Sequence, residues 1–298
     1  MRTLAVVADN PDVPLGVRVR LAHGAVQVIA RHHGVDLLHI KGPAVAPGLR
    51  TTASSSTDAD VLVRPAHVAR FMRALRRSGW QLQTGFTQGS AFEHAAGLYH
   101  PNWGLLDVHR RYPGLDRDPD LTFDHLWSGK SDVDLAAIGC PVPDRTAQAL
   151  ILLLHAARSG GVRGVARHPD HISVWVDATE DERAAITRLA TTLDAEVGLA
   201  AATGHLEDHS ADPEAALWRL FTQDHSRLDE WRARVGVAPT LRGKVTVVAR
   251  SFLVNRYFLE ESLGRPATHA DVGREFARRL GHGGRDLVAM ARRRRRSR

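Results

Sequence analysis

Cysteine is almost absent from this 298-residue chain, and Cys140 is the single example. One cysteine excludes an intramolecular disulfide and a cysteine-based zinc cluster, so we expect a reducing compartment, the cytoplasm. Long apolar runs are also missing, because the longest, Ala149–Leu154, is far shorter than the roughly 20 residues that span a bilayer. The first residues have no secretory leader pattern. We therefore expect no membrane partner.

Several catalytic signatures are missing as well. The chain has no His-Glu-x-x-His zinc motif, no Gly-x-Ser-x-Gly nucleophile elbow and no Walker-type phosphate loop. The segment His168-Pro169-Asp170-His171 has the residue types of a metal cluster, but its proline interrupts helical spacing. We interpret this segment as a loop or a helix cap.

Basic residues outnumber acidic ones, 40 to 33, which gives a net charge of +7. Arg292–Arg296 and Arg298 supply six of these charges, so residues 1–291 are almost neutral. A terminal arginine run can contact nucleic acid weakly through phosphate groups. The alternative is that residues 292–298 are a disordered, solubilising tail.

Two acidic residues stand at the start of a strand-like run at residues 54–63. Asp58 and Asp60 are two positions apart, and side chains with that spacing point to the same face of a strand. Two carboxylates so close repel each other unless a cation lies between them, and hard oxygen ligands of this kind suit Mg²⁺. Paired acids also occur in turns and on solvated strand edges, which is the alternative.

A second strand-like run, at residues 103–109, adds a third acid. Asp107 and His109 lie on one face of this run, and Leu106 and Val108 lie on the other. Three carboxylates on two strands predict a two-metal site, in which ions about 4 Å apart promote in-line phosphoryl transfer.

A strand predicted at Val35–Ile40 leads into Lys41-Gly42-Pro43 and an apolar stretch that we expect to begin a helix. Gly42 allows close approach to a ligand, and Pro43 suits the first helical position. Free amides at a helix start attract phosphate, and Lys41 could add a positive charge. An ordinary surface lysine is the alternative for Lys41.

These segments together resemble the bacterial uncharacterised nucleotidyltransferase family of the DNA polymerase beta superfamily. The resemblance covers residues 35–112, with Lys41-Gly42, Arg50, Asp58-Ala59-Asp60 and Leu106-Asp107-Val108-His109 as its motifs. It implies an α/β (α+β) fold, a small mixed sheet flanked by helices and followed by a mainly helical C-terminal domain.

The resemblance also implies roles for particular residues. Asp58 and Asp60 would be shared ligands of two Mg²⁺ ions, and Asp107 would be the ligand nearest the attacking hydroxyl. A Gly-Ser pair is usual in the superfamily where this chain has Lys41-Gly42, so a hydroxyl that contacts the phosphate must come from elsewhere. Ser55, Ser56 and Thr57 are available for this contact. Arg50 is either a phosphate clamp or a solvated loop residue. His109 either orients Asp107, touches a phosphate or is structural.

Two prolines at Gly139–Asp144 mark a domain boundary, and Asp144 is placed to cap the apolar helix that follows. We expect a catalytic domain at residues 1–140, a helical domain at 141–291 and the tail at 292–298. The helices expected from apolar periodicity are Leu15–His32 in the first domain and Ala184–Ala201, Pro213–Phe221, Ser226–Val235, Val245–Glu261 and His269–Leu280 in the second.

The leading functional hypothesis is a Mg²⁺-dependent nucleotidyltransferase. It would move a nucleoside monophosphate from a nucleoside triphosphate onto a hydroxyl-type acceptor and release pyrophosphate. The acceptor, whether small molecule, protein or RNA, is not specified by the sequence. Two alternatives are a non-catalytic binding or regulatory protein with the same fold, and a toxin-like transferase acting on tRNA.

Overall fold

The computed structural model describes residues 13–50, 56–86, 94–159, 164–222, 259, 267–274, 276 and 278. Residues 7–223 form one compact unit, and residues 1–6 and 224–298 form another. Among the helices that the structure describes, none combines the length and the apolar character needed to cross a bilayer. The unit at 7–223 carries all the predicted site residues.

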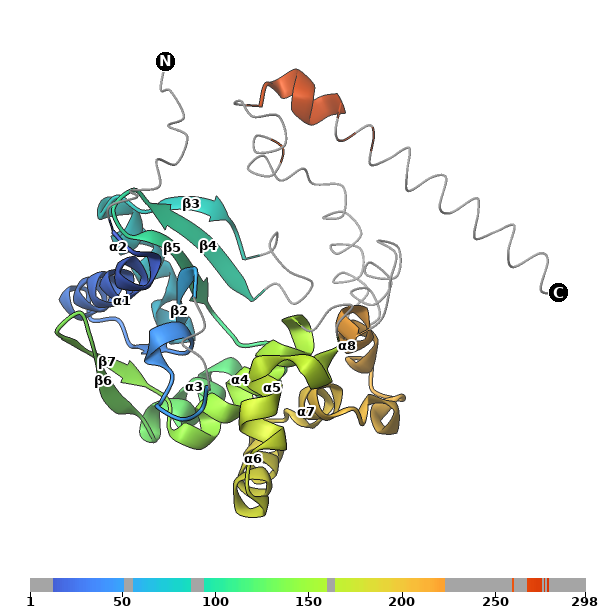
Figure 1. Ribbon diagram of the computed structural model, residues 1–298. Helices are drawn as coiled ribbons and strands as arrows, with labels where there is room; N and C mark the ends of the chain where they lie inside the picture. The colour runs from blue at the N-terminus through green and yellow to red at the C-terminus, as the bar shows by residue number, and fades with distance from the viewer. Residues whose placement is uncertain are drawn as a thin grey trace. The chain divides into compact units, whose positions relative to one another are not determined.

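A five-stranded mixed sheet lies at the centre of this unit (Figure 1). Its strands are β1 (Leu37–His39), β2 (Asp58–Val63), β3 (Gln81–Thr84), β4 (Ala95–His100) and β5 (Gly104–His109). Their order in the sheet is β1-β2-β5-β4-β3. β2 and β5 run parallel, whereas the other neighbouring pairs are antiparallel. The small mixed sheet that the resemblance implies is therefore confirmed.

One face of the sheet is apolar and buried. Alternate residues of β2 and β5, including Val61 and Val108, pack against α1 (Leu15–His32) and α2 (Val68–Arg77). Because side chains alternate along a strand, this packing turns the residues between them, among them Asp58, Asp60 and Asp107, to the opposite face. Burial of one face thus sets the direction of the acidic side chains.

The segment after β1 differs from the prediction. Gly42–Ala44 forms a single 3₁₀ turn, η1, and Val45 is already extended. Ala46 precedes Pro47, and a residue before proline disfavours the helical conformation, so the turn does not continue into a helix. The expected phosphate-binding helix start is thus only a short turn.

A two-stranded hairpin, absent from the sequence prediction, follows α3 (Pro119–Ser128). It consists of β6 (Ser131–Leu135) and β7 (Ile138–Val142). Ala136 and Ala137 form its turn with φ angles of 54° and 61°. Short hairpin turns usually have glycine or asparagine in this backbone region, so two alanines gave no recognisable turn pattern.

The second part of this unit is helical. Its main helices are α4 (Arg145–Ser159), α5 (Pro169–His171), α6 (Glu180–Thr192), α7 (Glu196–Thr203) and α8 (Ala215–Thr222), with short turns η4 (Val165–Arg167), η5 (Ile172–Val176) and η6 (Leu206–His209). The Asp144 cap is confirmed, because its Oδ1 accepts from the Ala147 amide at 2.9 Å. The helix expected at Ala184–Ala201 is two helices, which a left-handed Asp194 separates.

Some predictions concern the other unit or the ends of the chain. Residues 269–274 are helical, in agreement with the start of the last predicted helix. The helix predicted at Ser226–Val235, almost all of the one at Val245–Glu261, and the tail at 292–298 lie outside the described residues. The domain boundary near residue 140 stays a prediction.

Candidate active site

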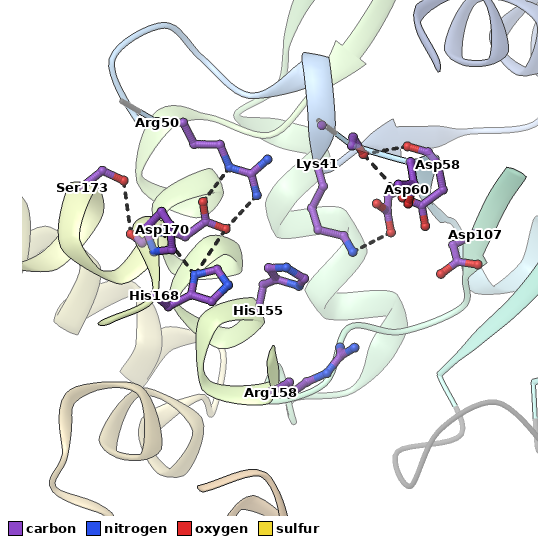
Figure 2. Close-up of a pocket in the computed structure, with 14 residues that line it drawn as sticks. Lys41, Arg50, Asp58, Asp60, Asp107, His155, Arg158, His168, Asp170 and Ser173 are labelled. Atoms are coloured by element: carbon purple, nitrogen blue, oxygen red, sulfur yellow. Dashed lines mark hydrogen bonds and ion pairs between the residues drawn. The ribbon is translucent and has the colours of Figure 1, made fainter. Parts of the chain in front are cut away.

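The three predicted acids meet at one pocket of about 510 Å³ (Figure 2). In the parallel pairing of β2 with β5, Asp60 lies opposite Asp107, and Asp58 shares the face of Asp60. All three line the pocket, together with Lys41, Gly42, Arg50 and Ser56. The structure therefore brings every predicted site residue except His109 to the surface of this pocket.

Asp60 is the most firmly held of the three acids. It is 2 % exposed, and its Oδ1 contacts Lys41 Nζ at 2.6 Å and His109 Nε2 at 2.9 Å. Burial by itself would raise the pKa of Asp60, but Lys41 and His109 outweigh it and hold the pKa far below its usual range. Asp60 is therefore a permanent carboxylate.

Asp58 and Asp107 have the opposite behaviour. Burial, together with the neighbouring carboxylates, raises the pKa of Asp58 to about 6 and that of Asp107 to about 7. Ser56 Oγ donates to the Asp58 backbone oxygen at 2.8 Å and lies 3.4 Å from its Oδ1. A bound cation would relieve the repulsion among the three carboxylates, so their oxygens fit a divalent metal.

His109 is bonded to Asp60 and is not part of the pocket lining. It is 1 % exposed. Burial lowers the pKa of His109 to about 4, so the neutral ring donates from Nε2 to the carboxylate. The ligand atoms of Asp60, Asp107 and His109 lie within 4.8 Å of one another. His109 thus orients Asp60.

Gly42 and Ser56 come together although the chain between them is long. Gly42 has φ of +64°, and a Cβ placed on it would lie 3.0 Å from Ser56 Oγ. Glycine is therefore required here both for its backbone conformation and for the close approach. Of the hydroxyls considered from the sequence, Ser56 adjoins the Lys41-Gly42 turn, whereas Ser55 lies outside the described residues.

The other side of the pocket comes from the helical part. We call this side the helical wall, and it consists of His155, Arg158, His168, Pro169, Asp170 and Ser173. His168 caps α5 by accepting from the Asp170 amide at 3.2 Å, so the predicted cap is confirmed. No residue of this wall was among the site residues predicted from the sequence.

Arg50 lines the pocket but is bound to the helical wall. Its Nε and Nη2 donate to the two carboxylate oxygens of Asp170, each at 2.7 Å. The ligand atoms of His155, His168 and Asp170 lie within 4.8 Å of one another. Because both Asp170 oxygens accept from Arg50, the guanidinium already supplies the cation of that cluster.

The loop before Arg50 is fixed to the helical part by several hydrogen bonds. These are Ala46 N to Gln148 Oε1 at 2.7 Å, Arg145 Nη1 to Pro47 O at 2.9 Å, and Ser173 Oγ to Leu49 O at 2.7 Å. With the Arg50 pair, they join residues 46–50 to α4, α5 and η5. The two sides of the pocket are thus linked through one loop.

A family model described as uncharacterised nucleotidyltransferase matches residues 22–208, and it therefore includes both sides of the pocket. A search among curated proteins finds no match.

Two solved structures are similar at low identity. Lincomycin-bound lincosamide antibiotic adenylyltransferase LnuA is 17% identical, covers 57% of this chain and 94% of its own, and has a TM-score of 0.33. An antigenic nucleotidyltransferase-like protein from Paracoccidioides brasiliensis is 14% identical, covers 63% of this chain and 92% of its own, and has a TM-score of 0.36.

Proposed function

Because this chain belongs to the uncharacterised nucleotidyltransferase family, we propose that it is an active, Mg²⁺-dependent enzyme. It transfers a nucleoside monophosphate from a nucleoside triphosphate to an acceptor hydroxyl and releases pyrophosphate. The observation that carries this proposal is the convergence of Asp58, Asp60 and Asp107 on one pocket, with two of the three pKa values raised by burial and mutual repulsion.

Asp107 is suited to accept the proton of the acceptor hydroxyl. Its raised pKa of about 7 lies close to neutral pH, where a general base is most effective. The hydroxyl oxygen then bonds to the α-phosphorus, the bond from phosphorus to the bridging oxygen breaks, and that oxygen leaves with pyrophosphate. Asp107 has no hydrogen bond or ion pair to any other described residue, so its oxygens are available.

Asp60 has a different role, which follows from its fixed charge. Lys41 and His109 both contact Oδ1, so Oδ2 would be the oxygen that holds a metal ion. Asp58, Asp60 and Asp107 would hold two Mg²⁺ ions, which when bound polarise the reacting phosphate and stabilise the leaving oxygen. Lys41 keeps Asp60 ionised before any metal arrives and adds a positive charge beside the triphosphate.

Calorimetry with each Mg-nucleoside triphosphate tests the binding part of this proposal. We expect the wild-type protein to bind at least one nucleotide, and the Asp60→Asn and Asp107→Asn variants to bind it less tightly or not at all. Asp134→Asn, which removes an exposed acid on β6, is the matched control.

Turnover is tested by incubating the protein with the bound nucleotide, labelled at the α-phosphate, and a cell extract. We expect label to move to an acceptor, and the rate to fall about 100-fold or more in Asp107→Asn, since a general base contributes about that much. Binding without any label transfer would favour the non-catalytic alternative. Absence of nucleotide binding in the wild type would contradict the proposal altogether.

A further inference from the structure

His155 and Arg158 of the helical wall each have a buried polar atom that no other described residue satisfies. They lie three positions apart on α4, so their side chains are neighbours on one face of the helix. Both line the pocket. The Nδ1 of His155 and the Nη1 of Arg158 are buried without a hydrogen-bond partner. Unsatisfied buried donors are rare in folded proteins, and two on one helix face indicate a bound acceptor.

Arg158 differs in its partners from Lys41 and Arg50, the other two cationic residues of this pocket lining. Lys41 is paired with Asp60, and Arg50 is paired with Asp170. Within the described residues Arg158 has no carboxylate partner, and its contact with an aromatic ring is to Tyr112, 6.0 Å from Cζ to the ring centre. A partly buried guanidinium without an anion is costly, so an anionic ligand would stabilise this arrangement.

The direction of the Arg158 side chain agrees with a ligand between the two sides of the pocket. Figure 2 shows Arg158 extending from α4 toward the side that carries Asp107, whereas Arg50 turns away to Asp170. The positive charge of Arg158 lies within electrostatic reach of Asp107. A ligand held by the acids at one end would therefore meet Arg158 at the other.

We propose that Arg158 and His155 form the subsite for the terminal phosphates of the nucleotide, the part that leaves as pyrophosphate. This inference rests on the proposed function. In this arrangement the α-phosphate lies at Asp58, Asp60 and Asp107, where the bond is formed, and the β- and γ-phosphates extend across the pocket to the helical wall. The planar guanidinium donates to phosphate oxygens in a fork, and His155 donates one N–H.

His155 acts here as a neutral donor. Burial, followed by the positive charges of Lys41 and Arg158, holds the pKa of His155 far below its usual range. A neutral imidazole has one N–H and one free lone pair, and the tautomer with hydrogen on Nδ1 presents a donor to phosphate. Arg158 contributes a positive charge to phosphate binding, and His155 contributes a directional hydrogen bond.

The test compares three ligands by calorimetry in Mg²⁺ buffer: the nucleoside triphosphate, inorganic pyrophosphate and the nucleoside monophosphate. In Arg158→Met we expect the first two to bind about 10- to 100-fold more weakly, the range expected for a charge-assisted hydrogen bond. The monophosphate should bind within about threefold of wild type, a tolerance worth well under 1.4 kcal/mol. Arg188→Met, an exposed arginine on α6, controls for the lost charge.

His155→Gln gives a second, milder comparison, because glutamine keeps a donor but not the position of Nδ1. We expect it to weaken pyrophosphate binding several-fold and to leave monophosphate binding unchanged. It also replaces the first variant if circular dichroism shows that Arg158→Met does not fold.

The outcomes separate this subsite from the function on which it rests. If the wild-type protein binds no Mg-nucleotide, the proposed function fails. If the wild type binds the triphosphate but Arg158→Met binds pyrophosphate as the wild type does, or weakens all three ligands equally, the subsite is wrong while the function stands.

Discussion

Lys41 and Asp60 form a buried ion pair, and both residues line the pocket. The side chains are 11% and 3% exposed, and their 2.6 Å contact keeps a carboxylate ionised inside the protein. Removing one member of such a buried pair leaves the other charge without compensation, which costs more than losing an exposed pair.

We therefore predict that Lys41→Met lowers the free energy of unfolding by about 3 kcal/mol or more in metal-free buffer. Adding Asp60→Asn to this variant should restore much of the loss, because no buried charge then remains. Urea unfolding of Lys41→Met, Asp60→Asn and the double variant measures the coupling energy between the two residues. Lys130→Met, at an exposed lysine, is the control. A loss in the double variant equal to the sum of the two single losses would show that the pair is not coupled.

At the residue scale, the common face of the three acids could be predicted because it depends only on neighbouring residues in the sequence. The spacing of Asp58 and Asp60 and the alternation around Asp107 specify a common face before any tertiary contact is known. Arg158 and Asp170 could not be found in this way. Their place in the pocket depends on how α4 and α5 pack, and the sequence near them shows only an apolar helix and a proline-containing segment.

The hairpin β6–β7 has a turn whose sequence opposes its backbone. Ala136 and Ala137 both have positive φ, a conformation that costs an L-residue roughly 1–2 kcal/mol. The turn persists because it packs on α1: a Cβ placed on Gly24 would lie 3.1 Å from the Leu135 carbonyl oxygen. Tertiary packing therefore determines this turn.

Replacing Ala136-Ala137 with Asn-Gly should stabilise the protein, because both residues tolerate positive φ. We expect a gain of about 1–2 kcal/mol and a rise in Tm of roughly 2–8 °C for a unit of this size. Differential scanning calorimetry measures the change. Ala185→Gly, within α6, should lower Tm instead and serves as the control. A Tm that stays the same or falls in the Asn-Gly variant would contradict the assigned turn.

At the scale of elements, apolar periodicity predicted α1 well because this helix packs one face on the sheet. It failed for the helix after Gly42 and for the division between α6 and α7. In both cases a few residues with backbone preferences of their own, such as Pro47 and Asp194, interrupt a run whose composition is otherwise compatible with helix.

The folded chain buries several histidines in their neutral form. His23 and His39 are fully buried and bonded to each other through their Nδ1 atoms at 2.7 Å, and His39 Nε2 lies 3.0 Å from Gln27 Oε1. Burial lowers the pKa of His23 to about 4 and holds that of His39 well below its usual range. Protonation of either ring is therefore opposed by the fold.

Acid should consequently destabilise the whole molecule. Below pH 6.5 the histidines of the unfolded chain bind protons, whereas the buried histidines of the folded chain stay neutral down to about pH 4. The free energy of unfolding is therefore highest above pH 6.5 and declines toward pH 4. His23 alone accounts for about 3 kcal/mol of this decline. Urea unfolding between pH 7 and 4.5 measures it. His23→Gln should flatten the dependence, whereas His32→Gln, at an exposed residue, should not. A flat profile for the wild type would contradict the neutral state.

The loop at residues 46–50 also affects how fast a ligand can bind. Its hydrogen bonds to Gln148, Arg145 and Ser173, with the Arg50–Asp170 pair, are formed within the protein itself. The entropy lost in joining the two sides of the pocket is thus spent during folding and not at the moment of association. A ligand that reaches this side of the pocket can therefore bind without a conformational change of the loop, which favours a high association rate constant.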